Sequence, residues 1–326
     1  MVSDANWLLP EGVEEILPAE ALKLEQLRRA ILDDLQGRDF QLVMPPVMEF
    51  VDALLTGTGE ELDTQTYKFM DQNSHRMLGI RADMTPQIAR IDAHYLADQD
   101  VNRLCYAGTV LRTQPEEMGG QRELLQIGAE LFGVADESAD IEIIDAMLQC
   151  LALSCQSQVT LSLGHVGIYR ALLEAQEAHD RALTASQISQ LFDVLLRKSS
   201  PDLQAMSDVI DTSQFDILLQ LQGGPEVIEE ASSSLTGEAE IGQCLAQLQA
   251  VVAHLQSAHP EVQIHIDLAD VFGYRYHTGL KFSAYVAERG RTVAKGGRYD
   301  RIGEQFGRAR PATGFSADLK TLVKLA

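Results

Sequence analysis

Residues 104–133 constrain the fold more than any other stretch of this chain, because they have the pattern of two strands joined by a polar loop. The loop, residues 114–121, contains glycine, as is typical of a hairpin with a long connection. Side chains alternate in direction along a strand. One face of the second strand is therefore wholly apolar and is predicted to point into a core; it consists of Leu125, Ile127, Ala129 and Leu131.

The opposite face of the second strand carries an amide and a carboxylate, Gln126 and Glu130, on either side of Gly128. Polar groups in a buried strand are costly unless they have partners. This pattern favours a small polar ligand lying over Gly128, with Arg112 as a fixed cation at the end of the first strand. The alternative is that Arg112, Gln126 and Glu130 only satisfy one another, and the pattern alone leaves both interpretations open.

The balance of charge is the most informative bulk property of the chain. Its 326 residues include 26 basic and 48 acidic side chains, which gives a net charge of -22. Proteins that bind nucleic acids cluster Lys and Arg to neutralise phosphates, and the sequence has no such cluster. We therefore expect neither a nucleic acid nor an anionic membrane as a partner.

The N-terminal region lacks a basic segment followed by an apolar one, and no window approaches the roughly 18 uninterrupted apolar residues of a membrane span. We therefore expect a cytoplasmic location. The cysteines lack the CxxC or Cys/His spacing of metal sites, so we expect no metal. They are predicted to be reduced and mostly buried thiols: Cys105, Cys150, Cys155 and Cys244.

A tight turn that carries a carboxylate precedes one of the predicted helices. Residues 66–71 and 76–81 alternate around turn-forming residues and predict a hairpin, after which Pro86 suits the first turn of a helix. Thr85 is predicted to be the N-cap of this helix. Asp83 then lies between the strand and the helix, where its carboxylate is either a second cap or a ligand group.

The remaining elements do not alternate as βαβ units. A helix is predicted over 18–36, and a strand over 41–47 that its two prolines confine to an edge or an interface. Helical periodicity dominates residues 166–259. Other helices are predicted at 139–153, after 300 and at the end of the chain, and other strands at 159–163, 262–268, 280–286, 292–295 and 313–316. We predict an α+β fold: a mainly antiparallel sheet of about seven strands with helices on one side and a helical insertion.

Together these segments resemble the catalytic core of class II aminoacyl-tRNA synthetases, and specifically histidyl-tRNA synthetase. The three motifs of the class correspond to Met44-Pro45-Pro46, the central hairpin and the segment that begins at residues 311–315. Three histidine-specific landmarks follow in the right order: 81–85 resembles RPEGT, 126–130 resembles QxGxE, and 296–300 reads GGRYD. The resemblance implies a synthetase-like core in two parts, residues 1–165 and 260–326, separated by a helical insertion at 166–259.

The resemblance also implies a set of histidine-binding residues. In the synthetase the positions of Asp83, Thr85 and Gln126 hold the α-ammonium group, and that of Glu130 helps to read the imidazole. These are the acceptors that a zwitterionic amino acid with a ring donor requires. The ring side is lined by Tyr276, His277 and Tyr299, although His277 stands where the family usually has tyrosine, and Arg112 retains one phosphate-site arginine.

The departures from the synthetase pattern concern ATP. The arginine that contacts the histidine carboxylate and the phosphate is replaced by Phe272, and the arginine of the third motif by Thr321. The loop of the second motif, ERPQ in the synthetase, reads Gln-Pro-Glu-Glu at 114–117. Positioned cations stabilise developing phosphate charge. The loss of two cations and the gain of acids therefore oppose ATP binding.

A retained histidine site beside a dismantled ATP site resembles the family of regulatory subunits of ATP phosphoribosyltransferase. That resemblance implies a protein without catalytic activity or cofactor, which activates a short-form catalytic subunit and transmits histidine feedback inhibition in the first step of histidine biosynthesis. It implies synthetase-like dimers within a hetero-octamer. The alternatives are an active histidyl-tRNA synthetase-type enzyme that forms histidyl-adenylate, and a scaffold dimer whose pocket is vestigial.

Overall fold

A computed structural model describes residues 8–56, 60–116, 120–154, 158–178, 183–235, 239–271, 273, 276–287 and 290–325. The chain forms two compact units. The first unit consists of Met1–Val134, Ile143–Gln156 and Arg301–Ala326, and the second of Ala135–Glu142 and Ser157–Asp300. Each unit is built from segments that are distant in the sequence. The domain boundaries at residues 165 and 259, which the resemblance implies, stay a prediction.

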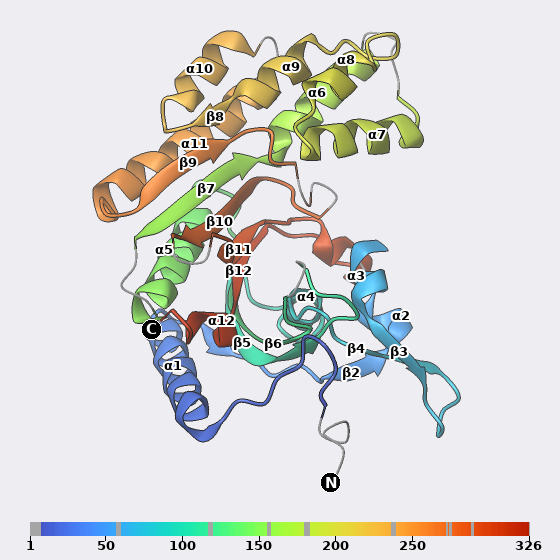
Figure 1. Ribbon diagram of the computed structural model, residues 1–326, viewed down its shortest axis with the longest axis vertical. Helices are drawn as coiled ribbons and strands as arrows, with labels where there is room; N and C mark the ends of the chain where they lie inside the picture. Colours follow the sequence, from blue (N-terminus) through green and yellow to red (C-terminus); the bar gives the residue numbers. More distant parts are fainter. Residues whose placement is uncertain are drawn as a thin grey trace. The chain divides into compact units, whose positions relative to one another are not determined.

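The predicted hairpin is the centre of the first unit (Figure 1). Its arms are β5 (Asn102–Leu111) and β6 (Glu123–Phe132), which pair in antiparallel register. β12 (Ala312–Asp318) pairs antiparallel to β6 on the other side, and the short β1 (Gln41–Leu42) lies parallel to β5 at the edge, as its following prolines predict. This register places Tyr106 opposite Gly128 and Gly314 opposite Glu130.

Helices cover this part of the sheet because each has an apolar stripe. α1 (Pro18–Gly37) contacts β1 and β5 and buries Leu24, Leu27, Ile31 and Leu35 at the predicted three- and four-residue spacing. α4 (Thr85–Tyr95) follows the smaller hairpin, and α12 (Leu319–Leu322) follows β12. The start of α5 (Glu137–Ser154), up to Glu142, belongs to the second unit, and the rest of α5 belongs to the first. The short helix predicted after residue 300 is the 3-10 helix Ile302–Phe306.

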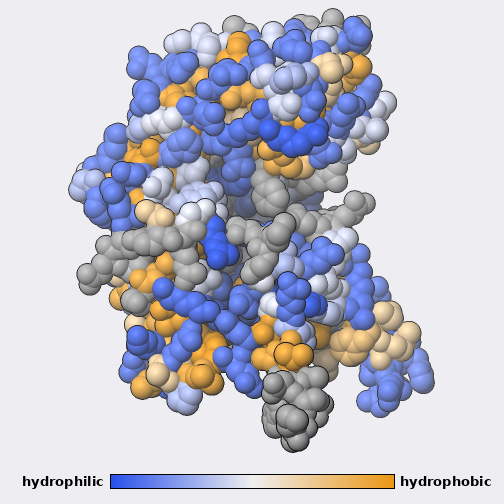
Figure 2. All heavy atoms as spheres, in the orientation of Figure 1, coloured by the Kyte–Doolittle hydropathy of each residue, from blue (hydrophilic) through white to orange (hydrophobic). Residues whose placement is uncertain are grey.

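A smaller sheet in the first unit has the order β2-β4-β3. The predicted hairpin is formed by β3 (Tyr67–Met70) and β4 (Met77–Ile80), while β2 (Met48–Phe50) and the short helices α2 (Val51–Leu54) and α3 (Glu60–Gln65) have no clear sequence pattern. Met70 and Met77 pair across the hairpin and are 55% and 42% exposed. Figure 2 shows apolar surface beside the polar tip of this hairpin, at the lower right.

The second unit has its own sheet strands in the order β11-β10-β7-β9-β8. These are β11 (Thr292–Arg298), β10 (Leu280–Val286), β7 (Val159–His165), β9 (Gln263–Asp267) and β8 (Gln222–Gly223). The β7–β9 pair is parallel, and the other described pairs are antiparallel. The helical run predicted over 166–259 is present as α6 (Val166–Ala178), α7 (Ala185–Leu196), α8 (Ser200–Gln204), α9 (Ser213–Gln220), α10 (Val227–Ser234) and α11 (Ala239–Ala258).

Among the described residues, no helix is both long enough and apolar enough to cross a lipid bilayer.

Candidate functional site

The first group of predicted site residues lies where β4 passes into α4, in the β4–α4 turn (residues 81–84). The prediction that Thr85 caps the helix is wrong: Met84 precedes the helix and Thr85 is its first residue. The backbone N–H of Thr85 donates instead to Oδ1 of Asp83 at 2.8 Å. A short carboxylate two residues upstream competes well for such an amide, and the Thr85 hydroxyl is therefore available to β6.

Gln126 of β6 fixes this turn from the other side. Its Oε1 accepts from the backbone N–H of Met84 at 2.9 Å, and its Nε2 donates to Oδ1 of Asp83 at 3.2 Å. Gln126 is 4% exposed, so both contacts are made away from water. Asp83 thus accepts the backbone N–H of the first residue of α4 and also belongs to a polar cluster, and both of these donors to its carboxylate are neutral amides.

Glu130 lies four residues after Gln126, on the same face of β6, and is 1% exposed. Its Oε1 accepts from the hydroxyl of Tyr106 at 2.9 Å and from the hydroxyl of Thr85 at 3.0 Å. The two hydroxyls are themselves 3.3 Å apart. The structure therefore brings Asp83, Thr85, Gln126 and Glu130 together, and we call these four residues with Tyr106 the polar cluster.

Tyr106 is the member of the cluster that the sequence pattern missed. Its ring lies over Gly128, where a Cβ would come within 2.6 Å of the phenol oxygen. The prediction of a ligand directly over Gly128 is therefore wrong, because the phenol fills that space. The signal was present in the hairpin, since the register pairs Tyr106 with Gly128. Burial, reinforced by the charges of Glu130 and Asp83, raises the pKa of Tyr106 well above its usual range, so the hydroxyl remains a donor.

Arg112 bonds outside the polar cluster. Its Nη1 pairs with Glu116 at 2.7 Å, and its Nε donates to the carbonyl of Ala82 at 3.3 Å. The alternative in which Arg112, Gln126 and Glu130 satisfy one another is thus wrong, because each has other partners. The side chain of Arg112 is 11% exposed, and its charge is matched by an acid that the loop of the second motif supplies.

The second group, Tyr276, His277 and Tyr299, lies in the second unit. The rings of Tyr276 and Tyr299 stack at 5.3 Å between centroids, and His277 meets Tyr276 edge to face, also at 5.3 Å. The imidazole of His277 packs between Gly273 and Gly297, and its Nδ1 has no hydrogen-bond partner among the described residues. Burial, with the nearby charge of Lys281, lowers the pKa of His277 to about 4, so the ring is neutral at pH 7.

The third motif shows what has replaced the lost arginine. The hydroxyl of Thr321 donates to Oδ2 of Asp318 at 2.8 Å, and the backbone N–H of Thr321 donates to the same oxygen at 3.0 Å. Thr321 therefore belongs to the cap of α12. The neighbouring cation, Lys320, pairs with Glu123 at 2.9 Å. Phe272, and the last acid of the 114–117 segment, lie outside the described residues.

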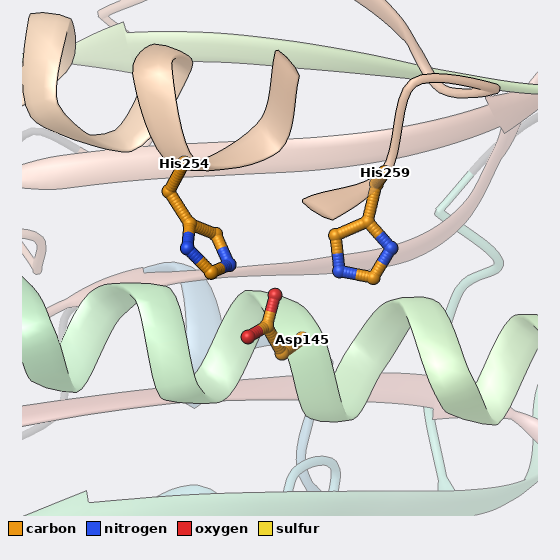
Figure 3. A group of neighbouring side chains, drawn as sticks. All are labelled: Asp145, His254 and His259. Atoms are coloured by element: carbon orange, nitrogen blue, oxygen red, sulfur yellow. The ribbon is translucent and has the colours of Figure 1, made fainter. Parts of the chain in front are cut away.

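Two histidines at the end of α11 form a separate contact in the second unit. The rings of His254 and His259 meet edge to face at 6.1 Å (Figure 3), and Nδ1 of His259 lies 3.6 Å from the carboxylate of Glu261. Asp145, also labelled in Figure 3, belongs to the first unit. Two imidazoles are fewer than the three or four protein ligands of a zinc site, and we assign them no metal.

The described cysteines are buried thiols outside any disulfide, as predicted: Cys105, Cys150 and Cys244. Burial raises the pKa of Cys105 and of Cys244 to about 11, which disfavours their reactive thiolate form. Cys155 lies outside the described residues.

The chain is similar to known proteins in sequence and in fold. A family model described as histidyl-tRNA synthetase matches residues 12–322. The chain is 47% identical to the ATP phosphoribosyltransferase regulatory subunit of Thioalkalivibrio sulfidiphilus, over 100% of the chain and 83% of that protein. An ATP phosphoribosyltransferase regulatory subunit/histidyl-tRNA synthetase from Bacillus halodurans superposes with a TM-score of 0.86 at 27% identity, over 100% of this chain and 84% of that one.

A further solved structure, the ATP phosphoribosyl transferase (HisG:HisZ) complex from Thermotoga maritima, superposes with a TM-score of 0.70 over 90% of this chain and 96% of that one. At 18% identity this likeness concerns the fold alone.

The fold and the family match define a class II, histidyl-tRNA synthetase-like protein, as predicted. Within that class, the relative that is 47% identical over 100% of this chain is named as a regulatory subunit. The chain belongs to the family of ATP phosphoribosyltransferase regulatory subunits, which are regulatory proteins rather than enzymes.

Proposed function

We propose that this protein activates a short-form ATP phosphoribosyltransferase catalytic subunit and confers histidine feedback inhibition on the first step of histidine biosynthesis. The names of its relatives support the choice of partner. The proposal places the protein in the cytoplasm, as dimers within a hetero-octamer and without a cofactor. The polar cluster of the first unit is the observation that carries the proposed histidine site.

The polar cluster has the chemistry that a free amino acid requires. Asp83 accepts hydrogen bonds from two neutral amides, the N–H of Thr85 and Nε2 of Gln126, and neither of these donors brings a counter-charge to its carboxylate. An α-ammonium group is the cation that such a carboxylate binds best, through charge-assisted hydrogen bonds. Glu130, held by two hydroxyl groups, offers a second carboxylate for the ring N–H of histidine.

On the nucleotide side of the synthetase-like site, two of the cations that the synthetase pattern has are replaced, and the retained one is paired with an acid. Arg112 is neutralised by Glu116, and Thr321 caps α12 where the synthetase pattern has an arginine. A phosphate group placed there would meet an acid rather than free positive charge, and electrostatic stabilisation of the transferring phosphoryl group would be lost. This supports a protein that senses histidine without activating it.

Feedback requires histidine to bind two states of the complex unequally, because a ligand with equal affinity for both states shifts neither. In the inhibited state the polar cluster binds histidine more tightly than in the active state. By reciprocity, assembly with the active catalytic subunit lowers the affinity for histidine.

The experiment is reconstitution with a short-form catalytic subunit. We expect this protein to raise its rate of phosphoribosyl transfer, and histidine to inhibit the mixture. Asp83→Asn, which removes the charge and keeps the shape, should leave activation intact and relieve inhibition. Asp63→Asn, which breaks a surface pair with Lys68, is the matched control. Unchanged inhibition with Asp83→Asn would exclude the polar cluster as the histidine site.

A further inference from the structure

The β4–α4 turn is bonded to another surface segment of the first unit, residues 45–50, which we call the proline segment. Arg81 of the turn donates from Nη1 to the carbonyl of Pro45 at 2.7 Å and to that of Pro46 at 3.4 Å. Its backbone N–H donates to the carbonyl of Val47 at 3.0 Å. The residue that starts the turn therefore holds three successive carbonyls of the proline segment.

Arg81 is a rigid connection rather than a surface contact. It is 3% exposed, and its Nε donates to the carbonyl of Thr109 in β5 at 2.8 Å. Its Nη2 lies 2.5 Å from the position of a Cβ at Gly108, so the guanidinium fits only because that residue is glycine. A planar guanidinium with fixed donors cannot follow a shift of the turn without breaking bonds to buried carbonyls.

α4 makes a second set of bonds to the same segment. Gln87, which is 1% exposed, donates from Nε2 to the carbonyl of Pro46 at 2.8 Å and to Oε1 of Glu49 at 2.7 Å. Arg90, one turn later on α4, forms a two-pronged ion pair with Glu49. α4 begins at Thr85, which belongs to the polar cluster. The same helix therefore carries a cluster residue and the two side chains, Gln87 and Arg90, that bond to the proline segment.

The outer side of this segment is apolar and exposed. Val47 and Met48 of the segment are 49% and 55% exposed, and Met44, immediately before it, is 77% exposed. The segment thus has an inner side of carbonyls and a carboxylate, held by the turn and α4, and an outer side that presents apolar side chains to the surroundings of the first unit.

We propose that ligand binding at the polar cluster restrains the motion of the proline segment. A ligand bound at Asp83 and Thr85 fixes the β4–α4 turn. The hydrogen bonds of Arg81 and Gln87 then restrain residues 45–50, including the apolar side chains on their outer side. The inference rests on the proposed function, because it takes histidine as the ligand. Local opening of the proline segment leaves buried donors and acceptors unpaired, so its frequency depends on how firmly the turn is held.

The test is amide hydrogen exchange at Val47–Phe50, with and without saturating histidine. We expect histidine to slow exchange there by about fivefold or more, a typical size for coupling between sites. Amides of α1 are the reference, because a general gain in stability slows them equally. Calorimetry on the same samples measures histidine binding.

Two variants remove the contribution of α4 to the connection without touching the polar cluster, and they leave the bonds of Arg81 in place. Gln87→Met keeps the length of the side chain and removes both donations, and Glu49→Gln removes the charge that Arg90 and Gln87 hold. Each should bind histidine as the wild type does, because opening of the proline segment is a minor state, and each should reduce the histidine-dependent protection. The use of both variants guards against one that fails to fold.

The outcomes separate the two proposals. Histidine binding without slower exchange at Val47–Phe50 would overturn the coupling and leave the proposed function in place. Full protection in both variants would also overturn it. A wild-type protein that does not bind histidine would overturn the proposed function, and with it this inference.

Discussion

The carboxylate of Glu130 lies in the space that a side chain at Gly314 would fill, because the two residues face each other across β6 and β12. The glycine thus leaves room for Glu130, the residue that we propose accepts a hydrogen bond from the imidazole of histidine. Gly314 has no left-handed backbone conformation, so the backbone of the strand accepts alanine. The Cβ would overlap the carboxylate of Glu130 and would lie 2.8 Å from the carbonyl oxygen of Ala129.

Gly314→Ala should therefore weaken histidine binding by roughly 1–3 kcal/mol, or about five- to 150-fold, because the methyl group displaces the carboxylate from its partners. Titration calorimetry measures the loss. Gly242→Ala is the control, since that glycine lies within α11 with open space around it and alanine there should add about 0.5–1 kcal/mol of stability. Equal histidine affinities for the two variants would contradict the claim that Gly314 leaves the space that the Glu130 carboxylate needs.

Glu130→Ala should weaken histidine more than Arg112→Ala does. Loss of Glu130 leaves a ring donor unpaired in a buried site, at a cost of roughly 1–3 kcal/mol. Arg112 instead pairs with Glu116 outside the cluster. The dissociation constants of histidine for the two variants measure this difference. Comparable losses of affinity would count against the role of Glu130 as the acceptor for the ring N–H.

Tyr106→Phe tests the residue that the sequence pattern missed. The variant keeps the ring over Gly128 and removes the hydroxyl that donates to Glu130. We expect an affinity loss of about 1 kcal/mol, the net worth of a typical hydrogen bond, with the thermal midpoint nearly unchanged. A variant that binds histidine as tightly as the wild type would show that this hydroxyl does not orient the carboxylate.

Stability should fall with acid through buried histidines of the second unit. His165 is 5% exposed; its Nε2 donates to Gln247 at 2.9 Å and its Nδ1 accepts from the N–H of Gly167, so the ring is held neutral. Burial lowers its pKa from 6.5 to about 4. The folded state therefore binds fewer protons than the unfolded chain, and the stabilisation is present above pH 6.5 and lost as the pH falls toward 4.

The loss from His165 alone is of order 3 kcal/mol across this window. His165→Gln keeps a donor and an acceptor and removes the titration. Urea unfolding of both proteins between neutral pH and pH 4 should therefore show a shallower decline for the variant. Parallel declines would mean that His165 does not contribute to the acid sensitivity.

The parts of the fold that sequence reasoning predicted are those with a strong repeating pattern. Alternation in β5 and β6 and the stripe of α1 predicted these elements and their buried faces. β2 and β8 are too short for a pattern to show. Their formation depends on partners that are distant in the chain, namely β4 for β2 and β9 for β8.

The polar cluster was predicted only in part, for a related reason. Gln126 and Glu130 were conspicuous as polar residues in an apolar strand. Tyr106 was not, because an aromatic residue is ordinary in a strand and its role depends on the register between two strands. The cap was misassigned because Thr85 and Asp83 both suit a helix start, and only the contact with Glu130 decides which side chain is used.

The most direct test of the account is the inhibition of phosphoribosyl transfer by histidine in a mixture of this protein and a short-form catalytic subunit, compared between the wild type and Asp83→Asn. The account predicts strong inhibition of the wild-type mixture and loss of inhibition, with activation retained, for the variant. A catalytic subunit whose rate and histidine response are the same with and without this protein would contradict it.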